Sequence, residues 1–150
     1  MGRIGIIVSA YHERITGKLL EGAKACCRAA GIGDDQVDVV WVPGAFELGI
    51  MTATLARDSR YSALVALGVV VRGETPHFEF VAGESSRALG AVAATGRPVG
   101  FGLLTTDTMA QAEARAGGAA GNKGYEAAEA AIRVADAIAQ LKAKDPDGSD

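Results

Sequence analysis

The segment from Arg72 to His77 brings a glycine, a carboxylate, a hydroxyl group and a histidine together in one short polar stretch. Gly73 would let the backbone approach a ligand closely, and free N–H groups at the start of a following helix would bind an anion without basic side chains. His77 would lie in the first turn of that helix, where the helix dipole disfavours an imidazolium and leaves a ring that exchanges protons. The stretch predicts a phosphate site with a proton-transfer residue, although a histidine that merely lies near a helix start is an equally good explanation.

Three further charged residues are candidates for the same site. Glu47 follows the turn Pro43-Gly44, and its carboxylate either hydrogen-bonds the polar edge of a ligand or, more simply, favours a helix N-terminus. Arg115 and Lys123 flank a glycine-rich stretch that follows no strand. They are either ordinary solvated charges or groups that reach a site from elsewhere, for example across a subunit boundary.

Aromatic side chains are few, and five of the eight lie at or beside these polar junctions. We expect Tyr11 and Phe101 to contact a ligand, since each stands where a strand is predicted to stop. Phe78 and Phe80 fall one turn or less into a helix, and for them we expect packing in the core.

These residues need a sheet that brings them together, and the apolar pattern predicts one. Short β-branched or apolar runs indicate four strands, and the segments between them show helical spacing or helix-start residues. Thr75 is the predicted N-cap of the third helix. The predicted strands are 3–9, 37–42, 62–71 and 99–104, and the predicted helices are 12–30, 45–57, 76–94, a short one within 105–114, and 125–142.

Because each strand is apolar throughout, the pattern is typical of a parallel sheet with helices on both faces. The predicted fold class is α/β: a three-layer, flavodoxin-like sandwich around a four-stranded parallel sheet. It forms one domain over residues 1–144, followed by a disordered polar tail at 145–150, and the glycines at 117–124 are expected in a loop. In such sheets ligands bind beyond the carboxyl ends of the strands, so the candidate residues that follow strands should meet there.

Composition limits the function. The 150-residue chain carries a formal charge of −3 and no basic cluster, which disfavours binding to nucleic acid. Its apolar runs fall short of the roughly 20 residues of a membrane span, and it begins with strand-like sequence, so we expect a cytoplasmic protein without a membrane partner. Cys26 and Cys27 are expected to be buried, reduced thiols. With 29 alanines and 20 glycines, the chain either packs helices very closely or buries further surface against copies of itself.

Four blocks of the sequence together resemble the 6,7-dimethyl-8-ribityllumazine synthase family, from Ile4 to about Leu141. They are VSAYHERITGKLLEGA, WVPGAFELG, ALGVVVRGETPHFEFV and PVGFGLLTTDTMAQAEARAGGAAGNKGYEAA. The resemblance implies a transferase that joins 5-amino-6-(D-ribitylamino)uracil to 3,4-dihydroxy-2-butanone 4-phosphate through a Schiff base, releasing phosphate and water. This is the penultimate step of riboflavin biosynthesis, and it implies no metal and no organic cofactor.

The resemblance also implies roles for individual residues. His77 would transfer protons, and Tyr11 takes the place of a residue, usually Phe or Trp, on which the pyrimidine stacks. His12 stands where the family usually has Asn. The phosphate would be held by Gly73, Glu74, Thr75 and Arg115. The pyrimidine and its ribityl chain would be bound by Tyr11, Ala45, Phe46, Glu47, Val69, Val70, Val71, Phe101 and Lys123.

The family architecture implies a homopentamer with each site between two neighbouring subunits, and in some relatives a sixty-subunit shell. Phe101, Arg115 and Lys123 would then come from the adjacent chain. Two alternatives remain at this point. One is a non-catalytic pentameric or shell-forming scaffold or flavin-binding relative, and the other is a flavodoxin-like protein that uses FMN for redox chemistry.

Overall fold

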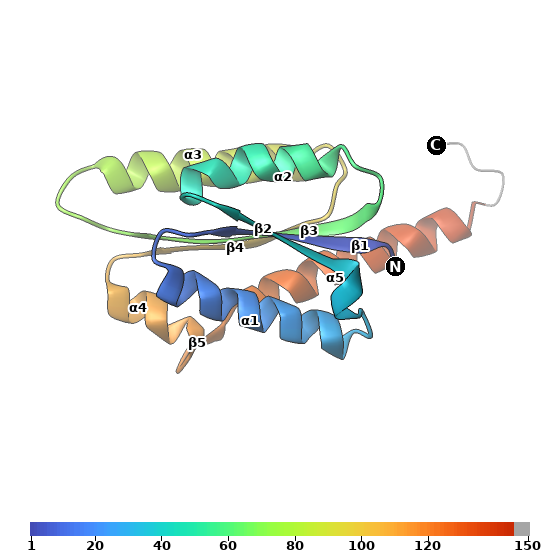
Figure 1. Ribbon diagram of the computed structural model, residues 1–150. Helices are drawn as coiled ribbons and strands as arrows, with labels where there is room; N and C mark the ends of the chain where they lie inside the picture. Colours follow the sequence, from blue (N-terminus) through green and yellow to red (C-terminus); the bar gives the residue numbers. More distant parts are fainter. Residues whose placement is uncertain (146–150) are drawn as a thin grey trace.

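The computed structural model describes residues 1–145. Its elements, in chain order, are β1 (Arg3–Ser9), α1 (Glu13–Ala29), η1 (Asp34–Gln36), β2 (Val37–Val42), η2 (Ala45–Glu47), α2 (Leu48–Ala56), β3 (Tyr61–Val71), α3 (His77–Ala93), β4 (Val99–Thr106), α4 (Met109–Ala114), β5 (Ala116–Gly118), β6 (Gly121–Asn122) and α5 (Lys123–Ala143). Four parallel strands form one sheet in the order β2-β1-β3-β4. Helices α1, α4 and α5 cover one face, and α2 and α3 cover the other (Figure 1). The predicted three-layer, flavodoxin-like α/β fold is confirmed.

Two apolar clusters hold the layers together, one on each face of the sheet. Along β1, Ile6 belongs to the cluster beneath α1 and α5, and Ile7 belongs to the cluster beneath α2 and α3. Along β3, Val65 and Leu64 divide in the same way. Successive side chains of a strand point to opposite faces, which is why strands that are apolar at every position are buried on both sides.

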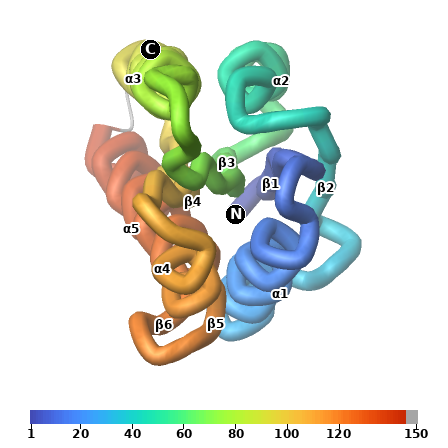
Figure 2. The backbone as a smooth tube through the Cα atoms, turned by 90° about the vertical axis from the view of Figure 1, so that its left-hand side faces the viewer, coloured from blue at the N-terminus to red at the C-terminus, as the bar shows by residue number. Residues whose placement is uncertain are grey.

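Small residues let α5 pack directly against its neighbours. A Cβ atom at Gly100 of β4 would overlap the carbonyl oxygen of Ala127, and one at Gly124 would overlap the carbonyl oxygen of Leu19 in α1. Figure 2 shows α1 and α5 side by side on the same face of the sheet. Very close helix packing, one of the two explanations for the scarcity of large side chains, is therefore present within the chain.

The glycine-rich segment forms a two-stranded antiparallel hairpin, β5 and β6, where a loop is predicted. Gly117 and Gly121 have φ values of 97° and 84°, which glycine adopts without steric cost. α5 begins at Lys123, before the predicted start at residue 125. The reason is a cap, because the Asn122 side chain accepts hydrogen bonds of 2.9 and 3.1 Å from two backbone N–H groups of the first turn.

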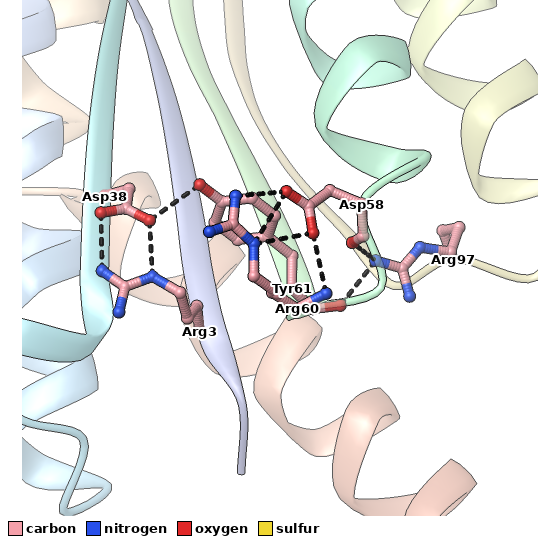
Figure 3. A network of polar contacts seen from close by, with 6 residues as sticks. All are labelled: Arg3, Asp38, Asp58, Arg60, Tyr61 and Arg97. Atoms are coloured by element: carbon pink, nitrogen blue, oxygen red, sulfur yellow. Dashed lines mark hydrogen bonds and ion pairs between the residues drawn. The ribbon is translucent and has the colours of Figure 1, made fainter.

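A polar network ties the edge of the sheet at which the strands begin (Figure 3). Arg3 donates two hydrogen bonds of 2.7 Å to the Asp38 carboxylate, and the Tyr61 hydroxyl donates a third of 2.7 Å. These hydrogen bonds join β1, β2 and β3, and they lower the pKa of Asp38 to about 2. Arg60 likewise donates to Asp58 and lowers its pKa to about 2. The network therefore fixes the amino ends of the strands. Ligands are predicted to bind at the opposite end of the sheet, beyond the carboxyl ends of the strands.

Cys26 and Cys27 are buried and form no disulfide, as predicted. Within residues 1–145, no helix is both long and apolar enough to cross a membrane. The predicted disordered tail begins at Asp145, whose N–H donates a hydrogen bond of 3.2 Å to the carbonyl oxygen of Lys142. The rest of the predicted tail, residues 146–150, lies outside the described residues.

Candidate active site

A cavity of about 800 Å³ opens beyond the carboxyl ends of β1 and β3, between η2 and the start of α3. The general rule for open parallel sheets predicts a ligand site at this edge. The lining is mostly apolar, with a few polar groups from separate segments, as is usual for small-molecule sites. It consists of Tyr11, His12, Gly44, Ala45, Phe46, Glu47, Val69, Val70, Val71, Gly73, Thr75, His77, Phe78, Phe80, Val81 and Glu84.

The last residues of β3 contribute an apolar surface to the cavity. β1 pairs with β3 only as far as Val8, opposite Leu67. Val69, Val70 and Val71 therefore extend past the paired part of β1, and the latter two remain half-buried. Their methyl groups favour a ligand that offers an apolar ring face over one that is charged throughout.

Tyr11 and His12 form the rim of the cavity directly after β1. The Tyr11 N–H donates a hydrogen bond of 3.1 Å to the carbonyl oxygen of Pro43, which ties this turn to the end of β2. The Tyr11 side chain is 67% exposed, so its ring face is free to stack on a planar ligand. His12 has a positive φ of 59°, a left-handed conformation immediately before α1.

The short helix η2 places Glu47 at the cavity and at the start of α2 at the same time. Ala45 is buried, Phe46 is exposed, and Glu47 is half-buried. Glu47 is the N-cap residue of α2, but its side chain makes no capping hydrogen bond. Its carboxylate oxygens therefore remain available as acceptors for a ligand, in addition to any favourable interaction with the helix dipole.

The connection between β3 and α3 closes another side of the cavity. Gly73, Thr75 and His77 line it, whereas the exposed Glu74 does not. α3 begins at His77, and its N-cap is Pro76, so the prediction of Thr75 as N-cap is wrong. The Thr75 hydroxyl lies 3.4 Å from the His77 nitrogen, at the outer limit of a hydrogen bond. With no side-chain cap, N–H groups of this first turn can bind an anion.

The sequence model of the 6,7-dimethyl-8-ribityllumazine synthase family matches residues 2–139 of the chain. The chain belongs to this family. Lumazine synthases are transferases of riboflavin biosynthesis, and the family membership gives the chain this activity. Nothing in the sequence or the fold favours a non-catalytic scaffold or a flavin-binding relative instead.

Besides the exposed Glu74, three residues singled out by the lumazine synthase motifs lie outside the large cavity of their own chain. Phe101 is 53% exposed in the first half of β4, so the prediction that it stands at a strand end is wrong. Lys123 begins α5 and forms an ion pair of 3.2 Å with Glu126. Arg115 lines a separate cavity of about 290 Å³ next to β4 and α4. Arg115 alone of these three lines the smaller cavity, and Phe101 and Lys123 line neither of the two cavities.

The first turns of α3 hold residues that sequence reasoning assigned to the core. Phe80 is 69% exposed and lines the large cavity, so its assignment to the core is wrong. Phe78 is half-buried, and the Arg72 guanidinium lies 4.4 Å from the centroid of its ring. The helical spacing of His77, Phe80 and Glu84 is the signal that could have placed all three on one face of α3.

Proposed function

We propose that the 800 Å³ cavity binds 5-amino-6-(D-ribitylamino)uracil. The observation that carries this proposal is that Tyr11, Glu47 and His77, which are far apart in the sequence, line one cavity. An exposed aromatic face suits a pyrimidine ring, and a carboxylate accepts hydrogen bonds from ring N–H or ribityl O–H groups. The proposed pyrimidine and ribityl contacts within the chain are Tyr11, Ala45, Phe46, Glu47, Val69, Val70 and Val71.

The phosphate of 3,4-dihydroxy-2-butanone 4-phosphate is proposed to bind along the backbone of Gly73, Glu74 and Thr75. Two features support this position. A Cβ atom at Gly73 would meet no atom within 4 Å, which leaves room for a ligand, and the adjacent start of α3 carries no side-chain cap. Arg115 is the proposed charged partner, because a guanidinium binds phosphate through two parallel hydrogen bonds.

In this proposal the two substrates condense through a Schiff base. The 5-amino group of the pyrimidine adds to the ketone carbonyl, and the adduct loses water to form the imine. Removal of the proton from the hydroxyl-bearing carbon then expels phosphate, and the resulting enol becomes a ketone. The ribitylamino nitrogen adds to this ketone, and loss of a second water closes the ring. His77 accepts the proton that the amine loses and returns it to the departing oxygen. Holding two substrates in register supplies most of the acceleration, and proton transfer adds about 10²-fold or more.

The assembly is proposed to be a homopentamer in which the adjacent subunit completes each site with Phe101, Arg115 and Lys123. The separation of these residues from the large cavity of their own chain supports this arrangement. Exposed aromatic side chains on both outer strands support it as well. Trp41 of β2 is 43% exposed and Phe101 of β4 is 53% exposed. The two outer strands of the sheet, β2 and β4, thus offer apolar surface that neighbouring copies can bury in a closed ring.

A cytoplasmic location is also proposed. Burial raises the pKa of the Cys27 thiol to about 11, so that this side chain stays protonated and unreactive. Unbridged, adjacent Cys26 and Cys27 are typical of a protein from a reducing compartment.

The function is tested by mixing both substrates with the purified chain and following the absorbance of the lumazine product. Formation of product above the uncatalysed rate supports the proposal, and its absence overturns it. Flavin binding without turnover would favour the scaffold or flavin-binding alternative. Sedimentation velocity tests the assembly, because it distinguishes a pentamer from a sixty-subunit shell, and a monomer would contradict the shared site.

A further inference from the structure

Arg72, the first residue after β3, connects three elements around the site. Its Nε atom donates a hydrogen bond of 2.9 Å to Asp107 in the turn between β4 and α4. Its Nη1 atom donates one of 2.8 Å to Glu79 in the first turn of α3, and its guanidinium stacks over Phe78. The backbone N–H of Arg72 donates 2.9 Å to the carbonyl oxygen of Thr106, which fixes the residue itself at the end of the sheet.

The turn that Arg72 holds through Asp107 also carries Arg115. The Asp107 N–H donates a hydrogen bond of 2.9 Å to the side-chain oxygen of Gln111. Arg115 in turn donates one of 3.0 Å to the carbonyl oxygen of Gln111. Arg72, Asp107, Gln111 and Arg115 line the same 290 Å³ cavity. A series of hydrogen bonds therefore leads from Arg72 through Asp107 and Gln111 to Arg115.

The contacts of Arg72 with Glu79 and Phe78 act on the other part of the site. Both residues belong to the first turn of α3, which begins with His77. Phe78 lines both the large and the small cavity. Fixing this turn fixes the point from which the His77 side chain projects and the direction of the uncapped N–H groups.

We propose that Arg72 is a positioning residue that places Arg115 through Asp107 and places His77 through Glu79. The inference rests on the proposed function, because the placement of Arg115 and His77 affects turnover only if both residues act in the synthase reaction. In the proposed pentamer Arg115 serves the adjacent site, so Arg72 joins groups of two neighbouring sites. An isolated surface ion pair contributes little, but one planar guanidinium shared by two carboxylates and a ring defines a geometry that a lysine cannot reproduce.

The test compares Arg72→Ala and Arg72→Lys with the control Arg28→Ala. Arg28 also binds one carboxylate through two hydrogen bonds, of 3.0 and 3.3 Å to Asp34, but at the far end of α1. We expect Arg72→Ala to raise KM for the butanone phosphate about tenfold or more and to lower kcat, with KM for the pyrimidine within about twofold of wild type. The KM and kcat of Arg72→Lys should fall between those of the wild type and Arg72→Ala. Arg28→Ala should have the kinetic constants of the wild type.

Asp107→Asn and Glu79→Gln test separately whether Arg72 positions Arg115 and whether it positions His77. Asp107→Asn is expected to raise KM for the butanone phosphate with kcat largely retained, and Glu79→Gln is expected to lower kcat with little change in either KM. Wild-type kinetics in both variants, beside a defective Arg72→Ala, would mean that Arg72 touches the substrate itself and would overturn the positioning role. An equal rise of both KM values in Arg72→Ala would overturn it too. If Arg72→Ala does not fold, the two carboxylate variants decide the outcome.

Failure of this inference differs from failure of the proposed function. If the wild type makes no lumazine, or if Arg115→Ala leaves KM for the butanone phosphate unchanged, the phosphate site itself is wrong, and the positioning role is overturned with it. If the wild type is active and Arg115→Ala is defective while Arg72→Ala behaves as wild type, only the positioning role of Arg72 is overturned.

Discussion

Tyr11 and His12 contact each other edge to face at the rim of the cavity, with ring centroids 4.4 Å apart and ring planes at 60°. His12 holds a left-handed backbone conformation, with φ of 59° and ψ of 49°, which a residue with a Cβ atom rarely adopts. Its carbonyl oxygen accepts hydrogen bonds from the N–H groups of Ile15 and Thr16, and so starts α1. Strained backbone of this kind is typical of functional sites, where the surrounding structure holds it in place.

Tyr11→Ala is expected to weaken binding of the lumazine product about tenfold or more, because stacking of a base on an aromatic ring contributes about 1–3 kcal/mol. Tyr11→Phe keeps the ring face and is expected to bind within a few-fold of the wild type. A fluorescence titration with the lumazine measures both affinities. Unchanged affinity of Tyr11→Ala would show that the exposed ring is not the stacking platform.

His77→Ala is expected to lower kcat about 10²-fold with small changes in both KM values, since substrate positioning remains. Arg115→Ala is expected to raise KM for the butanone phosphate far more than KM for the pyrimidine. If each site combines groups of two subunits, mixed pentamers of the two impaired variants contain some sites with both residues intact. Activity should then return after the two variants are unfolded and refolded together, and not after each is refolded alone. No recovery in pentamers shown to be mixed would place both residues in one subunit's site.

Asp38→Asn is expected to reduce the acid sensitivity of folding. Hydrogen bonds from Arg3 and Tyr61 hold the pKa of Asp38 at about 2 in the folded chain, below its ordinary value of about 3.9. The charged carboxylate therefore stabilises the fold above its ordinary pKa, and this contribution is lost as the pH falls from about 5 to 2. Urea unfolding at several pH values measures it. The gap between wild type and Asp38→Asn should close toward pH 2, whereas the exposed control Asp35→Asn should track the wild type throughout.

Gly124→Ala is expected to lower the free energy of unfolding by about 1–3 kcal/mol, because the added Cβ would overlap the backbone of Leu19 and push α5 away from α1. Gly17→Ala is the matched control on α1. A Cβ atom there would meet no atom within 4 Å, and alanine favours a helix by about 0.5–1 kcal/mol over glycine. Thermal unfolding should therefore shift in opposite directions for the two variants. Equal effects would mean that α1 and α5 are not in backbone contact.

Much of the large cavity could be predicted from the sequence because its residues follow strands. Tyr11 comes after β1, Glu47 soon after β2, and His77 after β3, and parallel strands end at one edge of the sheet. The face of α3 could not be placed in the same way. An aromatic residue such as Phe80 fits a buried helix stripe as well as a cavity wall, and only the orientation of the helix against the sheet decides between them.

The hairpin of β5 and β6 depends on contacts that the local sequence does not show. The Lys123 N–H donates a hydrogen bond of 2.9 Å to the carbonyl oxygen of Arg115. The Ala120 N–H donates one of 2.9 Å to the carbonyl oxygen of Ala114. These bonds fold the glycine-rich segment back on the end of α4. A run of glycines and alanines indicates a loop on composition alone, since neither residue has a side chain that reveals strand pairing.

Because α1 packs against α5, it is synthesised well before the segment that covers it. The Asn122 side chain donates a hydrogen bond of 3.0 Å to the carbonyl oxygen of Lys18, across a sequence separation of 104 residues. At ordinary rates of translation, synthesis of the intervening residues takes about 5–20 s. During this interval the apolar cluster beneath α1 and α5 is incompletely covered. The nascent chain is then most accessible to chaperones and most prone to misassembly with other nascent chains.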